Sequence, residues 1–346
     1  MAAVKVQWSL TIRFDWPISR RLTGRGWRAK PPRPRRDQRG VVVHGWRLNS
    51  LRQRIVYTFE SAGIAIIFGL MRLMPVDWAS DMAGYVGRKI GPLLKESRIG
   101  RENLRAAFPE KSAAEIEAIL VGSWDNLLRT FAEYSQLDRL WDQAPEDGFK
   151  QSRIEFVDRE RFLQLRDNSR PGIVFTGHCG NWELLPVAAE RYGLPLAIVF
   201  RPPNNPLARR LVERVRRRSM GRMLPSSAMG TAAAAAGALD RGDNLGLLID
   251  QYFGRGIDVP FFGRPARTPP TLGKLARQFD CPVTGAVVER VKGARFRLHI
   301  LPPIEIPRTP DGDIDDRALM AAVTKSLEDW VRVHPEQWLW VHRRWR

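Results

Sequence analysis

The chain has 346 residues, of which 44% are hydrophobic, so it can bury a large core and is not a disordered protein. Its formal net charge of +19 indicates an anionic partner, such as nucleic acid, phospholipid or a phosphorylated substrate. The two cysteines, Cys179 and Cys281, are too few for a disulfide framework, and the five scattered histidines argue against a structural zinc site.

Residues 1–54 contain fourteen Lys or Arg and two Asp, and they show no sustained hydrophobic period. We interpret this segment as a basic arm that is mostly disordered. No apolar run with a small-residue cleavage site follows the first charges, which argues against a secretory signal. An extension without a role and a functional arm both fit this composition.

Residues 55–74 are the most apolar long stretch of the chain. Glu60 and Arg72 bracket an uncharged run that is short for a membrane span, which needs roughly 20 residues. A buried core helix, an interfacial helix and a marginal span all fit this run. The positive charges upstream would hold the N-terminus in the cytoplasm, and a single span would then send the rest of the chain outside. We therefore expect a membrane-associated helix over residues 55–75 that lies in or dips into the cytoplasmic leaflet.

The segment from Val76 to Leu140 is expected to be helical. Asp77 and Ser112 are plausible helix caps, and Phe108-Pro109 ends one helix. Apolar residues then recur at helical spacing at Ile116, Ile119, Leu120, Trp124, Leu127, Leu128 and Phe131.

Short apolar runs alternate with helix-compatible segments from Ile154 onward. The expected strands are residues 154–157, 172–176, 196–200, 245–249 and 283–289, with a further edge strand at 295–301. The expected helices are residues 182–191, 206–220, 230–240, 271–279 and 315–333. This alternation predicts an α/β fold in which helices flank a mostly parallel central sheet, formed by one domain over residues 76–346.

Three polar side chains, His178, Arg201 and Asp250, come directly after predicted strands. Open α/β sheets carry their chemistry at these strand ends. His178 lies in a glycine-containing loop, five residues before Glu183 at the start of a predicted helix. An imidazole can take a proton near neutral pH, and a carboxylate can orient it and stabilise its charged form. A structural histidine is the alternative, and Cys179 is an alternative nucleophile.

Two further segments could bind substrate. Arg201 is followed by Pro202 in a proline-rich loop, and a fixed guanidinium suits phosphate binding, although a surface ion pair fits equally. An apolar loop around Phe261, Phe262 and Gly263 suits a lipid chain, and core packing is the alternative for its phenylalanines. The aromatic and basic C-terminus, residues 338–346, fits a core segment, a membrane-facing edge or an anion-binding edge.

Five sequence blocks together resemble the lipid A biosynthesis acyltransferases, the late lauroyl/myristoyl-type enzymes of the lysophospholipid acyltransferase superfamily. The blocks are Gly177-His178-Cys179-Gly180-Asn181-Trp182-Glu183, Phe200-Arg201-Pro202, Asp250-Gln251, Val259-Pro260-Phe261-Phe262-Gly263 and Gln337-Trp338-Leu339-Trp340-Val341-His342-Arg343-Arg344. The resemblance runs from about Ile55 to the C-terminus, and the long basic arm is a departure from the family.

The resemblance implies an inner-membrane enzyme at the cytoplasmic face, which moves an acyl chain from acyl carrier protein to a hydroxyl of a phosphorylated lipid A precursor. It matches His178 to the catalytic histidine and Glu183 to its acidic partner. It matches Arg201, Asp250 and the Phe261–Gly263 segment to the later blocks.

In the expected mechanism His178 removes the hydroxyl proton while Glu183 orients the ring, and loop amides near Gly180 and Asn181 stabilise the oxyanion. Pro202 and Gly263 belong to the expected substrate-binding set. No metal or bound cofactor is required. A glycerolipid or ornithine-lipid O-acyltransferase is the alternative enzyme. A basic nucleic-acid-binding protein is the non-enzyme alternative, but no known reader motif is present, so no nucleic-acid partner is expected.

Overall fold

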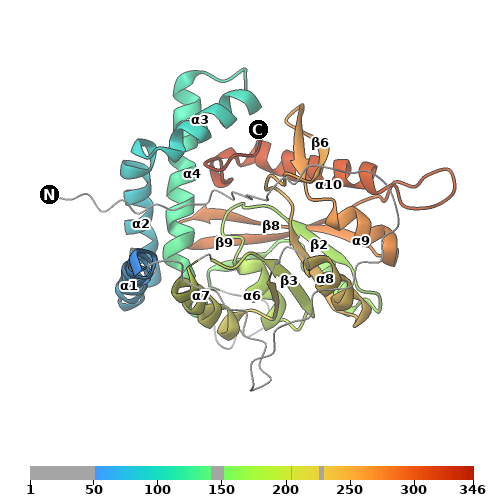
Figure 1. Ribbon diagram of the computed structural model, residues 1–346, viewed down its shortest axis with the longest axis horizontal. Coiled ribbons are helices and arrows are strands. Elements are labelled where there is room, and N and C mark those ends of the chain that lie inside the picture. The colour runs from blue at the N-terminus through green and yellow to red at the C-terminus, as the bar shows by residue number, and fades with distance from the viewer. Residues whose placement is uncertain (1–50, 142–151, 204, 226–229) are drawn as a thin grey trace.

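Among the residues that the structure describes, seven strands form one mixed sheet, as the computed structural model shows (Figure 1). The described residues are 51–141, 152–203, 205–225 and 230–346. The sheet contains β1 (Ile154–Phe156), β2 (Ile173–Thr176), β3 (Leu196–Phe200), β4 (Arg222–Pro225), β5 (Asn244–Leu248), β8 (Val283–Lys292) and β9 (Arg295–Pro303). The strand order is β1-β9-β8-β2-β5-β3-β4, and only the β8–β9 pair is antiparallel. The expected fold, a mostly parallel sheet flanked by helices, is confirmed.

The helices of the described residues fall into an N-terminal group and a group that alternates with the strands. The first group is α1 (Leu51–Leu73), α2 (Val76–Ile90), η1 (Gly91–Leu93), α3 (Glu96–Ala107), α4 (Ala113–Tyr134) and η2 (Leu137–Arg139). The second is α5 (Arg159–Asp167), α6 (Leu184–Arg191), α7 (Pro206–Ser219), α8 (Thr231–Asp240), α9 (Thr271–Phe279), α10 (Asp316–Val333) and η3 (Pro335–Gln337). The sequence predicted α6 to α10 to within two residues at each end, but it did not predict α5.

Strand β2 lies in the middle of the sheet because its side chains are apolar on both faces. Ile173 pairs with Leu245 of β5 on one side and with Val283 of β8 on the other. Ile173 and Phe175 pack into the cluster that contains α8, α9 and α10, whereas Val174 packs with α5 and α6. Successive strand residues alternate between faces, so helices cover both sides of β2 and leave only its end open for chemistry.

The expected edge strand at residues 295–301 is a strand, but the prediction of its position was wrong. Strand β9 lies between β1 and β8, because residues 154–156 pair with residues 296–298 and cover that side. The alternating pattern of β9 reports how exposed its faces are and does not reveal whether a short strand from far upstream will pair with it.

The two predicted caps had different outcomes. Ser112 caps α4, and it forms a capping box with Glu115. Asp77 caps nothing, because the residue that precedes α2 is Pro75, and the Asp77 carboxylate instead accepts hydrogen bonds of 2.6 and 2.8 Å from Arg153.

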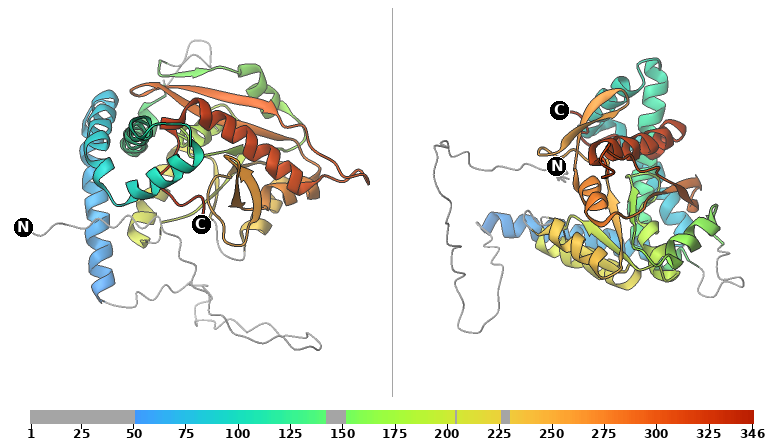
Figure 2. Two further views of the ribbon diagram at one scale, coloured as in Figure 1. Left: turned by 90° about the horizontal axis from the view of Figure 1, so that it is seen from above. Right: turned by 90° about the vertical axis from the view of Figure 1, so that its right-hand side faces the viewer.

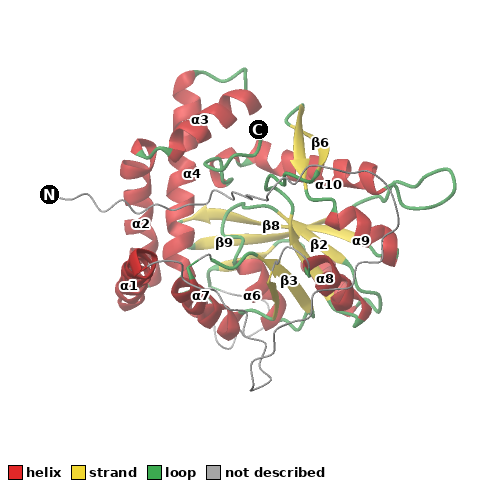
Figure 3. Cartoon of the chain, viewed as in Figure 1, coloured by secondary structure: helices red, strands yellow, loops and turns green. Residues whose placement is uncertain are grey.

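The expected apolar loop around Phe261 is instead a second, two-stranded structure. Strands β6 (Ile257–Phe261) and β7 (Arg264–Thr268) form an antiparallel hairpin that stands apart from the main sheet (Figure 3). Phe262 and Gly263 form its turn and both have positive φ angles, 53° and 68°, as a type I′ turn requires.

Helix α1 begins at Leu51, four residues before the expected start. Within the described residues it is the one helix that is long and apolar enough to cross a membrane, over Arg54–Leu73. The predicted basic arm lies almost wholly in residues 1–50, outside the described residues, so it stays a prediction.

Candidate functional site

Two of the three expected strand-end residues meet. His178 follows β2 and Asp250 follows β5, and these strands are parallel neighbours. The Asp250 Oδ1 atom lies 2.8 Å from His178 Nδ1, and Oδ2 accepts a 2.7 Å hydrogen bond from the His178 backbone N–H. One carboxylate therefore fixes both the ring and the backbone of the histidine.

The C-terminal segment closes over this pair. Trp338 Nε1 donates a 2.8 Å hydrogen bond to Asp250 Oδ2, and the His342 ring lies 3.3 Å from the Asp250 backbone oxygen. The Asp250 side chain is completely buried. Burial alone would raise its pKa, but the charge of His178 and the hydrogen bonds outweigh burial and hold the pKa of Asp250 well below its usual range.

The ring of His178 is set up to accept a proton at Nε2. Burial disfavours the imidazolium, yet the charge and hydrogen bond of Asp250, with a smaller effect of Glu183, raise the pKa of His178 above its ordinary value. In the neutral ring, Nδ1–H donates to the Asp250 carboxylate, which leaves Nε2 as the unprotonated nitrogen. Nε2 lies 3.3 Å from the side-chain Nε2 of Gln251, an amide donor.

Glu183 does not orient the ring through a hydrogen bond, because Asp250 occupies that position. Instead Glu183 Oε1 accepts a 2.9 Å hydrogen bond from Arg216 on α7, and each of the two side chains is 14% exposed. Arg216 also donates to the hydroxyl of Tyr134. Glu183 is therefore close enough to act on His178 through its charge, while its direct partner is an arginine.

Gly180 gives the loop its sharp turn. Its φ angle is +55°, and a Cβ atom there would lie 2.0 Å from the backbone oxygen of Val288. Its N–H donates a 2.9 Å hydrogen bond to the Gln337 carbonyl, so this amide is not free to stabilise an oxyanion as expected. The side chain of Asn181 is buried, and its amide donates a 2.8 Å hydrogen bond to Glu133.

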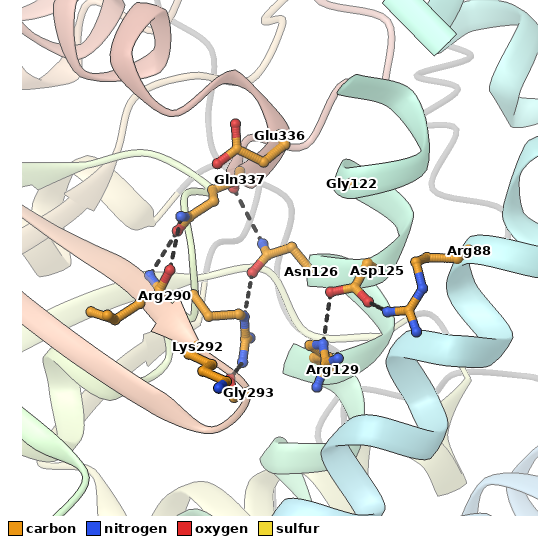
Figure 4. Close-up of a pocket in the computed structure, with 11 residues that line it drawn as sticks. Arg88, Gly122, Asp125, Asn126, Arg129, Arg290, Lys292, Gly293, Glu336 and Gln337 are labelled. Carbon is orange, nitrogen blue, oxygen red and sulfur yellow. Dashed lines mark hydrogen bonds and ion pairs between the residues drawn. The ribbon is translucent and has the colours of Figure 1, made fainter. Parts of the chain in front are cut away.

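Side chains of helix α4 hydrogen-bond to the loop that carries His178. Asn126 and Thr130 donate hydrogen bonds of 3.0 and 3.1 Å to the Gly180 carbonyl. Glu133 binds Asn181 and forms a buried ion pair with Arg290. Figure 4 shows Asn126, Arg290 and Gln337 converging at the wall of a pocket of about 350 Å³. The loop therefore depends on residues from α4, β8 and η3.

The remaining expected residues lie farther from His178. Arg201 and Pro202 follow β3, which is two strands from β2, so their backbone lies roughly 10 Å away across the sheet. Arg201 is exposed and has no ion pair with any described residue. Phe261 is fully buried against Trp338, and exposed Gly263 lies at the hairpin turn, so the structure favours core packing for Phe261.

The alternative nucleophile and a metal site find no support in this geometry. Cys179 is buried, and burial and the charge of Asp250 raise the pKa of its thiol well above the usual range, which keeps it protonated. Among the described residues no group of three or more His, Cys, Asp and Glu side chains could hold a metal ion.

Sequence reasoning missed three residues that contact the pair. Gln251, Trp338 and His342 were noted only as members of the blocks that carry the resemblance, and none of them was expected to touch the site. The signal for Gln251 was its position next to Asp250 at a strand end, whereas nothing local places Trp338 beside residue 250.

Comparisons with known proteins agree with the resemblance. A family described as bacterial lipid A biosynthesis acyltransferase matches residues 47–346. A lipid A biosynthesis palmitoleoyltransferase of Escherichia coli K12 is 28% identical over 277 residues, covering 76% of this chain and 84% of the relative. The myristoyltransferase of that pathway from the same strain is 24% identical, covering 81% and 84%, and its lauroyltransferase is 26% identical, covering 73% and 79%.

Replacing Asp250 by Asn tests how the ring is held. The change removes the charge that favours the imidazolium, so the pKa of His178 falls and the acid limb of the kcat/KM profile moves to lower pH. An amide also favours the wrong ring tautomer, so turnover should fall on the order of 10³-fold. The control Asp258→Asn changes an exposed carboxylate on the hairpin and should alter neither turnover nor the acid limb of the kcat/KM profile. An unmoved acid limb in Asp250→Asn would remove Asp250 from this role.

Replacing Gly180 by Ala tests the turn against a matched glycine. Gly193 also has a positive φ angle, +71°, but nothing lies within 4 Å of a Cβ atom there. We expect Gly193→Ala to cost roughly 1–2 kcal/mol from backbone strain. Gly180→Ala should cost about 3 kcal/mol or more, because it adds a clash with a backbone oxygen, and it should abolish turnover. Thermal unfolding of both variants measures the difference, and equal losses would contradict the packing described.

Proposed function

This chain belongs to the bacterial lipid A biosynthesis acyltransferase family, and we propose that it moves a fatty acyl chain from acyl carrier protein to a hydroxyl of a phosphorylated lipid A precursor. The chain is thus an acyltransferase of lipid A synthesis. We propose the identity of the acyl donor, the identity of the acyl acceptor and the roles of the catalytic residues. The observation that carries the mechanism is the 2.8 Å contact between the buried Asp250 carboxylate and His178 Nδ1, from which we infer that Nε2 is the unprotonated nitrogen of the neutral ring.

His178 acts as the general base. Its Nε2 takes the proton of the acceptor hydroxyl as the oxygen attacks the thioester carbonyl carbon, and Asp250 stabilises the imidazolium that results. The tetrahedral intermediate then breaks its C–S bond, and the imidazolium returns the proton to the leaving thiolate. The raised pKa of His178 makes the ring a stronger base, and the site needs a pH above that pKa to hold the neutral form.

Gln251 and Glu183 support this reaction in different ways. The Gln251 amide lies 3.3 Å from His178 Nε2, the nitrogen that takes the proton, and we assign this amide to the oxyanion in place of the occupied Gly180 amide. Glu183 adds negative charge that favours the imidazolium, and Arg216 holds it in place. Arg201, exposed at the end of β3, is positioned to bind an acceptor phosphate.

Helix α1 places the enzyme on the membrane. Near its start, Asn205 donates hydrogen bonds to the Tyr57 carbonyl and to Glu60. Near its end, Arg72 pairs with Asp138 through two hydrogen bonds of 2.8 and 2.6 Å. The helix is therefore tied to the catalytic domain at both ends.

These ties favour a helix that lies in the membrane surface. Between Tyr57 and Arg72 the helix rises about 22 Å, which is shorter than the hydrocarbon core of roughly 30 Å. If α1 spanned the membrane, Asn205 or Asp138, which are bonded to its two ends, would therefore be drawn into lipid. We therefore propose that α1 lies along the cytoplasmic face of the inner membrane, on the side where acyl carrier protein and positive flanking charges belong.

Replacing His178 by Ala should lower acyl transfer from acyl carrier protein to a lipid A precursor on the order of 10³-fold or more, because the general base is lost. His299→Ala is the control, since that histidine pairs with Glu289 on the sheet. Radiolabelled transfer with purified, folded variants makes the measurement, and near-normal turnover in His178→Ala would remove the proposed base. Acyl-CoA as donor, and a lysophospholipid or ornithine lipid as acceptor, test the two substrates separately.

Reporter fusions at residue 50 and at the C-terminus should both report the cytoplasm, because an interfacial α1 leaves both flanks on one side. At each position, the phosphatase activity of an alkaline phosphatase fusion reports the periplasm, and the fluorescence of a green fluorescent protein fusion reports the cytoplasm. A periplasmic signal at residue 50 with a cytoplasmic C-terminus would establish a single span and leave the catalytic assignment untouched.

A further inference from the structure

A second apolar stripe is exposed next to α1, on α2 and η1. Trp78, Met82 and Tyr85 are spaced by four and three residues, so they share one face of α2. Trp78 is 69% exposed and Tyr85 is 57% exposed. The stripe continues through Ile90 into η1, where Leu93 is 82% exposed. Exposed apolar side chains gathered on one face mark an interaction surface.

The opposite face of α2 fixes the stripe outward. Ala79, Ser80 and Ala83 are buried, and Gly84 and Gly87 let the helix approach α4 closely. A Cβ atom at Gly87 would lie 2.4 Å from the Trp124 backbone oxygen. Rotating α2 to bury Trp78 would replace these small residues by large ones in a space that has no room, so the stripe stays exposed in the folded protein.

Helix α1, which contacts α2, has an exposed apolar face of its own. Phe59, Ile66, Leu70 and Leu73 are exposed along one side of α1, whereas Phe68 packs on Phe131 of α4. Figures 1 and 2 show α1 outside α7 and α2 outside α4 at the same edge of the molecule. In Figure 1, α1 is seen nearly end-on while α2 runs up the view, so the axes of the two helices lie at a large angle to each other.

The chemistry of this edge fits a phospholipid surface. Trp and Tyr are enriched where membrane meets water, and the Lys89 ammonium, 5.9 Å from the Tyr85 ring centroid, adds a positive charge within the stripe. In the sequence, fourteen Lys and Arg fall in residues 1–54, which precede α1 and include its first four residues. Anionic headgroups match both sets of charges, whereas pairing with a second copy of this face would bring like charges together.

We propose that the stripe Trp78-Met82-Tyr85, with Ile90 and Leu93, is a second membrane-docking element that lies in the same anionic leaflet as α1. A single interfacial helix can roll about its axis. Two helices at a large angle to each other define a plane, so the pair sets the tilt of the catalytic domain and hence the height of His178 above the lipid. This inference rests on the proposed membrane contact of α1. Its tests measure membrane depth and vesicle binding, not acyl transfer, so a negative result would not affect the proposed reaction.

Site-directed spin labels measure the depth of each element. Cys179 and Cys281 are buried, so a nitroxide reagent will label a cysteine introduced at an exposed position of the full chain. Tyr85→Cys tests the stripe, Leu73→Cys tests α1, and Val333→Cys, at a position 70% exposed on α10, is the control. The probe is a phosphatidylcholine vesicle that contains phosphatidylglycerol.

We expect the labels at residues 85 and 73 to gain oxygen accessibility and lose accessibility to a water-soluble nickel complex, while the label at 333 stays in water. A label at 85 that stays in water while the label at 73 is immersed would overturn the proposal. So would a stripe that is covered by a second copy of the chain, seen as a spin–spin interaction at residue 85 without vesicles.

A stripe variant gives an independent test. Trp78→Ser/Met82→Ser/Tyr85→Ser should lower vesicle binding by at least about tenfold, since burying even one large apolar side chain is worth that much. The double variant Val157→Ser/Val333→Ser, which changes exposed apolar side chains elsewhere, should bind as the parent does. Circular dichroism checks that both fold. Equal binding by the stripe variant and the parent would overturn the proposal.

Discussion

The buried carboxylate of Asp250 is the constraint on which the site depends. Removing a charge from water costs several kcal/mol, and three hydrogen bonds from His178 Nδ1, the His178 backbone and Trp338 Nε1 offset that cost at roughly 1.5–3 kcal/mol each. Two of these donors belong to His178, and the third belongs to Trp338 in the C-terminal segment. The charge therefore ties the end of β2, the end of β5 and the C-terminal segment to one point.

The residues packed around the His178 loop also hold its backbone in one position. Gly180 turns the loop, and its carbonyl and amide are both taken by α4 and η3, so the backbone around His178 has little freedom. The ion pair between Glu133 and Arg290 fills the space under Asn181 and lies away from water. Breaking one partner of such a pair leaves an uncompensated charge, so this part of the core resists change in the loop position. A fixed base is what proton transfer needs.

The sequence predicted most helices, the strand-end position of His178 and Asp250, and every strand of the main sheet except β4, because hydrophobic periodicity and turn residues are local properties. It did not predict the strands of the β6–β7 hairpin. It could not predict which residue touches the imidazole. Spacing favoured Glu183, five residues away, but the sheet order places Asp250, 72 residues away, on Nδ1. Glu183 turns instead to Arg216, whose helix lies elsewhere in sequence. Phe261 was ambiguous for the same reason, since only its burial against Trp338 separates core packing from lipid contact. The places of β9 and β1 in the sheet likewise follow from long-range pairing.

Nitrogen NMR of the imidazole tests the central claim most directly. With ¹⁵N-labelled protein in detergent, and with His178→Gln to assign its signals among the five histidines, the chemical shifts report which ring nitrogen carries the proton. Above the pKa of His178, the account predicts a single neutral tautomer with the proton on Nδ1 and a bare Nε2. A neutral ring protonated on Nε2, or a mixture that Asp250→Asn leaves unchanged, would contradict it.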